Sequence, residues 1–178
     1  MNDTAVANRS RQLFESGYYC AESVLLAVAE SQGIKSDLIP KIATGFCGGI
    51  ARTSGMCGAV SGAIMAINLS TGRTSPEQSV KDSYLAVQKL LKTFEVKYGS
   101  TNCRQLLGCD LATPEGQQRF KENRLAEKCK DFTAEAARMA VLTLVEERKT
   151  LATRLAAGLG RASAGDDAVF PCQRRQPF

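Results

Sequence analysis

Residues 76–98 read PEQSVKDSYLAVQKLLKTFEVKY, and this stretch decides the fold class. Ser75 suits the N-cap position, Pro76 suits the first helical position, and Gln78 completes a capping box. Gly99 supplies a C-terminal stop. Apolar side chains recur at alternating steps of four and three, which makes a narrow stripe for packing against other helices. The stripe consists of Val80, Tyr84, Val87, Leu91, Phe94 and Tyr98.

The neighbouring segments also predict helices. One covers residues 20–31 and ends at Gly33, and another covers residues 131–149. Residues 56–69, MCGAVSGAIMAINL, predict a helix whose small side chains let a neighbouring backbone come close. The stretch before it, GFCGGIARTSG, is typical of a turn with left-handed residues rather than of a phosphate-binding loop. Shorter helices are expected over residues 4–15, 37–46 and 103–107.

No segment is typical of a β-strand, so the sequence predicts an all-α fold. We expect a single compact helical bundle of about six to seven helices, with spare helix surface that would suit a homodimer. Residues 1–150 would form this cysteine-containing helical domain, and residues 151–178, rich in small residues, Gly and Pro, would form a disordered C-terminal tail.

Composition excludes several classes of function. The net charge is +5, of which residues 151–178 carry +2, so no basic cluster indicates a nucleic-acid partner. No run of 18 apolar residues predicts a membrane span, and the first residues lack the apolar core of a secretion signal. The sequence therefore predicts a cytoplasmic protein.

Histidine is absent from the chain, which excludes a Ser-His-Asp or Cys-His catalytic apparatus and His-ligated metals. It also excludes haem attached through CxxCH. Any chemistry must then come from cysteines. No CxxC is present, so a disulfide or a thiolate-ligated metal would need thiols from separate segments. The seven cysteines are Cys20, Cys47, Cys57, Cys103, Cys109, Cys129 and Cys172.

Four cysteines fall at predicted helix starts. Cys20, Cys57 and Cys103 open helices, and Cys129 precedes the last helix by about two residues. Free N–H groups and the helix dipole at such positions favour thiolate over thiol and lower a cysteine pKa from about 8.5. Cys103 is therefore expected to be more acidic than a free cysteine. The ordinary alternative is that these residues are small buried hydrophobes.

The other three cysteines carry weaker signals. Cys47 follows Phe46 at a predicted helix end, where the dipole disfavours a thiolate. Cys109, just after Gly108, gives no clear indication. Cys172 falls in the predicted tail and is expected to be an incidental exposed thiol.

Four blocks of sequence carry a family resemblance: GYYCAESVLLA, GFCGGIARTSGMCGAVSGAIMA, YGSTNCRQLLGCDL and KCKDFTAEAA. In this order they resemble the C_GCAxxG_C_C family of redox-active proteins, over about residues 10–147. The named cluster matches residues 57–62, with the order Cys-Gly-Ala instead of Gly-Cys-Ala. The resemblance implies a redox role, and it places the family's separated cysteines on Cys20, Cys57, Cys103 and Cys129.

Three functions remain open from the sequence. The leading one is thiol-based redox chemistry, either dithiol/disulfide exchange or electron transfer, with Cys20, Cys57, Cys103 and Cys129 as catalytic residues and an unknown redox partner. The second is a thiolate-ligated metal or iron–sulfur site built from the same thiols. The third is a non-catalytic helical interaction module with buried thiols.

Overall fold

The helices of this protein follow one another through short turns and loops. The computed structural model describes residues 2–158, and within that range the only β-type pairing is an isolated bridge between Met56 and Asn102. The predicted all-α fold is confirmed. The helices are α1 (Asp3–Glu15), α2 (Cys20–Ser31), the 3-10 helix η1 (Lys41–Phe46), α3 (Cys47–Ile50), α4 (Gly58–Thr71), α5 (Lys81–Tyr98), α6 (Cys103–Leu107), α7 (Pro114–Glu122) and α8 (Ala126–Ala156).

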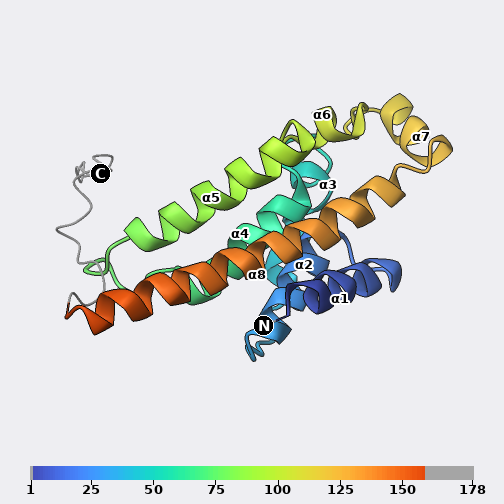
Figure 1. Ribbon diagram of the computed structural model, residues 1–178. Coiled ribbons are helices and arrows are strands. Elements are labelled where there is room, and N and C mark those ends of the chain that lie inside the picture. Colours follow the sequence, from blue (N-terminus) through green and yellow to red (C-terminus); the bar gives the residue numbers. More distant parts are fainter. Residues whose placement is uncertain (1, 159–178) are drawn as a thin grey trace.

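Helices α5 and α8 form a long antiparallel pair, and α4, α2 and α1 pack against α8 (Figure 1). The short helices α3, α6 and α7 gather near the end of the bundle where α8 begins. The core is mainly aliphatic, as expected from a chain without Trp. Its largest fully buried side chains include Phe94, Leu25, Ile67, Leu90 and Leu144.

Helices α2 and α4 approach each other closely through small side chains. A Cβ atom added to Gly62 would lie 2.5 Å from the carbonyl oxygen of Ala21. No side chain fits between the two backbones there, so glycine is required. This is the close approach that the small residues of the 56–69 segment predict.

Helix α5 differs from the prediction in its start and in its buried face. It begins at Lys81, because Gln78 accepts the backbone N–H of Thr74 at 2.7 Å and holds the preceding residues in a turn. Tyr84, which the predicted stripe includes, is 43% exposed. The buried face lies one residue earlier along most of the helix, and it consists of Ser83, Ala86, Leu90 and Phe94.

Helix α8 is longer than the predicted 131–149 at both ends. Its early start places Cys129 inside the first turns of the helix rather than before it. Phe132 anchors α8 on α5, with its ring centroid 6.1 Å from that of Phe94 and 4.9 Å from that of Tyr98. These aromatic contacts join the start of α8 to the end of α5.

Two further segments differ from the sequence prediction. Residues 37–46 form turns followed by the 3-10 helix η1 in place of an α-helix. Helix α7 was not predicted, although Thr113 caps it by accepting the N–H of Gly116 at 3.0 Å and Pro114 occupies its first position. The helix has few buried side chains, and hydrophobic periodicity is therefore a weak signal for it.

Helix α8 continues to Ala156, so it includes the first residues of the segment assigned to the tail. The remainder of the predicted tail, residues 159–178, lies outside the described residues, and so does Cys172. Among the helices of residues 2–158, none combines the length and the apolar character needed to cross a membrane.

Candidate functional site

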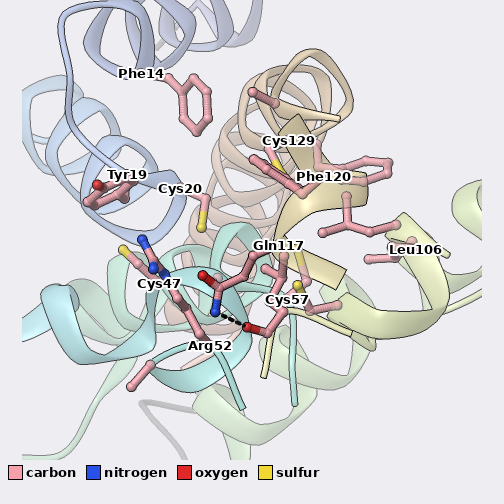
Figure 2. A pocket seen from close by; sticks show the side chains of 18 of the residues that line it. Phe14, Tyr19, Cys20, Cys47, Arg52, Cys57, Leu106, Gln117, Phe120 and Cys129 are labelled. Carbon is pink, nitrogen blue, oxygen red and sulfur yellow. Dashed lines mark hydrogen bonds between the residues drawn. The ribbon is translucent and has the colours of Figure 1, made fainter. Parts of the chain in front are cut away.

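A cavity of about 590 Å³ opens where the first turns of several helices meet, and five cysteines line it (Figure 2). Cys20 is the first residue of α2, Cys57 is the N-cap of α4 and Cys103 is the first residue of α6. Cys129 reaches the cavity from α8. The structure therefore brings together all four cysteines that the sequence selects. Cys47, at the junction of η1 and α3, joins them.

Cys20 and Cys47 are close neighbours. The Cys20 thiol is the largest cause of a Cys47 pKa far above that of a free thiol, and the Cys47 thiol itself donates a hydrogen bond to the carbonyl of Ala43 at 3.7 Å. A Cβ atom added to Gly58 would lie 2.4 Å from Cys20 Sγ and 3.2 Å from Cys47 Cα. The two cysteines thus meet across the start of α4, although 27 positions separate them in the sequence.

The position of Cys47 corrects the reason for its weak acidity. Its sulfur faces the first turn of α2, where the backbone N–H groups of Glu22 and Ala21 lower its pKa. Burial and the adjacent Cys20 outweigh these groups, so the pKa of Cys47 rises.

A buried carboxylate fixes the geometry of this pair. Glu22 is only 9% exposed, and it accepts hydrogen bonds from the backbone N–H of Tyr19 at 2.8 Å and from the Thr44 hydroxyl at 2.7 Å. Tyr19 precedes Cys20, and Thr44 lies in η1 just before Cys47. Glu22 therefore ties the two cysteine-bearing segments together.

Cys57, Cys103 and Cys129 form a second group of thiols. Burial raises the pKa of Cys57 and Cys103 to about 11 and the pKa of Cys129 to about 12. The charges of Cys57 and Cys103 add to the shift in the pKa of Cys129. The expected lowering of pKa at helix starts is therefore wrong for these three cysteines, because desolvation exceeds the effect of the helix N-termini.

Individual helix starts show why the dipole effect is small here. The N–H groups of Ala59 and Val60 do lower the pKa of Cys57, but its burial dominates. At Cys103, the side chain of Asn102 already accepts the N–H of Gln105 at 3.1 Å, and the N–H of Cys103 donates to Gly55 at 2.7 Å. Little free N–H capacity then remains for the Cys103 sulfur.

A run of left-handed residues connects Cys47 to the remaining thiols. Gly48, Gly49, Ile50, Ala51 and Arg52 have φ values of 65°, 70°, 60°, 50° and 64°. This confirms the predicted turn with left-handed residues. Left-handed backbone costs about 1–2 kcal/mol for each non-glycine residue, so surrounding contacts must hold it.

Those contacts are hydrogen bonds on both sides of the run. Gly55 donates to Gly49 at 2.9 Å and accepts from Cys103 at 2.7 Å. The N–H of Cys57 donates to Thr101 at 2.8 Å. Gly49 packs directly on Cys103, whose Cβ would lie 2.5 Å from a Cβ on Gly49. The run turns the chain back so that Cys47, Cys57 and Cys103 border one cavity.

The cavity wall is mostly apolar. Aromatic rings and leucines supply most of it, including Phe14, Phe120, Phe132, Leu106, Leu107 and Leu111. Arg52 and Lys121 add two cationic side chains, and no Asp or Glu of the described residues lines the cavity. Gln117 reaches into it and donates from Nε2 to the carbonyl of Leu111 at 3.0 Å (Figure 2).

The remaining cysteine of the described part, Cys109, is buried but does not line the cavity. Within residues 2–158, no group of three or more Cys, Asp or Glu side chains has the arrangement of a metal site. The cysteines surround the cavity instead of converging on one point.

The fold and the cavity define an all-helical protein whose potential reactive groups are thiols drawn from separate helices. A family model matches residues 18–143, and the chain belongs to that family, described as "Putative redox-active protein (C_GCAxxG_C_C)". The match confirms the resemblance seen in the sequence blocks. Comparisons with curated proteins and with solved structures gave no match.

Proposed function

We propose that this protein carries out dithiol–disulfide redox chemistry in the five-cysteine cavity, with Cys20 and Cys47 as the reacting pair. The observation that carries the proposal is their proximity: a Cβ atom added to Gly58 would lie 2.4 Å from Cys20 Sγ and 3.2 Å from Cys47 Cα, and both cysteines border the cavity. Membership of a redox-active family supports a role of this kind, and the fixed contact through Glu22 keeps the pair in place.

The reaction balances as a two-electron, two-proton oxidation. The S–H bonds of Cys20 and Cys47 break, an S–S bond forms, and two electrons and two protons pass to an organic acceptor that becomes reduced. Because the Cys47 pKa is raised, this thiol still holds its proton at neutral pH. The oxidation therefore releases two protons, which the reduced acceptor or water takes up.

Cys57, Cys103 and Cys129 have a supporting role in this proposal. They border the same cavity, and each holds its proton at neutral pH because burial raises its pKa. A second disulfide among them would extend the capacity of the cavity from two to four electrons. A cytoplasmic location, where thiols are kept reduced, fits a cycle that begins from the dithiol.

The test is controlled oxidation followed by disulfide mapping. The reduced protein is treated anaerobically with one equivalent of diamide, which accepts two electrons and two protons, and the disulfides are located by peptide mass spectrometry. We expect a Cys20–Cys47 peptide pair. The Cys20→Ser and Cys47→Ser variants should both lose it, whereas Cys109→Ser, altered outside the cavity, should keep it.

Two outcomes would contradict the proposal. One is a protein that keeps both thiols free while diamide is consumed elsewhere. The other is a first disulfide between Cys103 and Cys109. Either result would favour the interpretation of Cys20 and Cys47 as packing residues of a helical interaction module.

A further inference from the structure

The cavity has the size of a small-molecule site and lies beside the proposed dithiol. Its volume is about 590 Å³, and ligand sites in proteins commonly have volumes of about 300–1,000 Å³. Cys20 and Cys47 are part of its wall, so a molecule inside would be near both sulfurs. The remaining wall then indicates which class of molecule the cavity accepts.

The apolar wall favours a flat, ring-based molecule over a peptide-like one. Rings of Phe14, Phe120 and Phe132 border the cavity, and aromatic rings stack well on planar ligands. A peptide disulfide such as oxidised glutathione would bring many amide and carboxylate groups that these walls leave unpaired. Polar groups buried without partners weaken binding strongly.

The charged residues of the wall favour an anionic substituent. Arg52 and Lys121 are both exposed, and with no carboxylate in the wall their charges are not opposed within the cavity. Gln117 uses its amide donor on Leu111, so its carbonyl oxygen is the group left to accept a hydrogen bond from a ligand hydroxyl. These positions suit a ring with a hydroxyl group and an acidic group.

We propose that the cavity binds a planar, mostly apolar quinone that carries an anionic group, and that this quinone exchanges electrons with the Cys20–Cys47 dithiol. The inference rests on the proposed function and names its acceptor class. The dithiol gives two electrons and two protons, the quinone carbonyls become hydroxyls, and the S–S bond forms. The same step in reverse reduces the disulfide.

Anthraquinone-2-sulfonate is a suitable probe, because it is planar and anionic and its substituted quinone ring forms no thiol adducts. Binding to the full chain is measured anaerobically by titration calorimetry, with 2-methylanthraquinone as the uncharged comparison. We expect the sulfonate to bind about tenfold more tightly, as one charge-assisted contact at a partly exposed site would give. The Arg52→Gln variant should remove most of that preference, whereas Lys92→Gln, on the exposed face of α5, should keep it.

Electron exchange is measured in both directions, so that the relative potentials do not decide the result. Reduced protein is mixed with the quinone, and diamide-oxidised protein is mixed with the dithionite-reduced quinone. The absorbance of the reduced anthraquinone and the mapped disulfide report the transfer. We expect exchange in at least one direction, and its loss in Cys20→Ser although that variant still binds the probe.

The outcomes separate this inference from the proposed function. A Cys20–Cys47 disulfide formed by diamide, without binding of the probe, would overturn the quinone inference alone. Binding without electron exchange in either direction would overturn the acceptor assignment. Exchange that persists in Cys20→Ser would overturn the reacting pair and leave the ligand class supported.

Discussion

Replacing Gly58 by alanine should destabilise the protein through a clash with sulfur. The added Cβ would lie 2.4 Å from Cys20 Sγ and 2.9 Å from the carbonyl oxygen of Phe46. Ordinary contacts begin near 3.4 Å, so the sulfur or the start of α4 must move by about 1 Å. Overpacking of this kind costs about 1–3 kcal/mol. Alanine regains about 0.5–1 kcal/mol in a helix, so we expect a net loss of about 1–2 kcal/mol.

Urea unfolding in the presence of a reductant measures the free energy of unfolding for this variant. Gly45→Ala is the matched control, because a Cβ on Gly45 meets nothing within 4 Å and its φ is not left-handed. The Cys20→Ala background identifies the clashing atom. Gly58→Ala should cost less there by at least about 0.5 kcal/mol, since residues in direct contact couple by this much or more.

The contact with Phe46 remains in that background, so relief should be partial. Equal losses in the two backgrounds would refute the claim that the missing side chain of Gly58 makes room for Cys20. A Gly58→Ala protein as stable as Gly45→Ala would refute the close packing itself. The variant should also form the Cys20–Cys47 disulfide more slowly, because the Cys20 sulfur is displaced.

Four further results are expected. Ala51→Gly should raise the free energy of unfolding by about 1 kcal/mol, because Ala51 is exposed and left-handed at φ 50°; an unchanged or lower value in urea unfolding would count against the strained run. Gly116→Ala should lower the thermal midpoint more than Gly58→Ala does, because a Cβ atom at position 116 would lie 1.7 Å from the backbone oxygen of Asp110. A smaller decrease in the thermal midpoint would show that α7 can shift to relieve the clash. Burial raises the pKa of Cys57 and Cys103 to about 11, so the folded protein keeps protons that the unfolded chain releases, and the free energy of unfolding in urea should fall between about pH 9 and pH 11. The free energy of unfolding of Cys57→Ala should fall less steeply, and a free energy that rises over this pH range would contradict the direction of the shifts. A limiting amount of iodoacetamide should modify Cys103 before Cys47, and the rate at Cys103 should level off at lower pH, because the pKa of Cys47 is raised further. Mass spectrometry across a pH series measures both rates, and the reverse order would contradict the proximity of Cys47 to Cys20.

Local signals in the sequence predicted much of the fold. The bounds of α2 and α6 agree with the predicted 20–31 and 103–107, because capping residues and glycine stops mark those helices. Helix α5 shows the limit of such signals. Gln78 can complete a capping box, but it bonds to Thr74 instead, and the buried face depends on which residues α8 presents. Periodicity indicates a face, and tertiary contacts select it.

The sequence predicted which thiols gather but not their acidity. Placement at helix starts led to Cys20, Cys57, Cys103 and Cys129, all of which line the cavity. The sequence does not select Cys47, because the predicted helix before it ends there. Its sulfur instead faces the first turn of α2, which sequence position does not reveal. The raised pKa values of Cys57, Cys103 and Cys129 arise mainly from burial, a property of the folded molecule that local sequence does not show.

The spacing of the cavity cysteines has a consequence for how the chain must fold. Cys20 and Cys47 are 27 positions apart, whereas Cys57 and Cys129 are 72 apart. Closing a longer loop costs more entropy, so an unfolded chain exposed to oxidant would link near cysteines first, including Cys47 with Cys57. The native neighbours of Cys129 reach it only after α8 has packed on the earlier helices. Folding under reducing conditions therefore protects the cavity from mispaired disulfides, which would hold its walls apart before the last helix arrives.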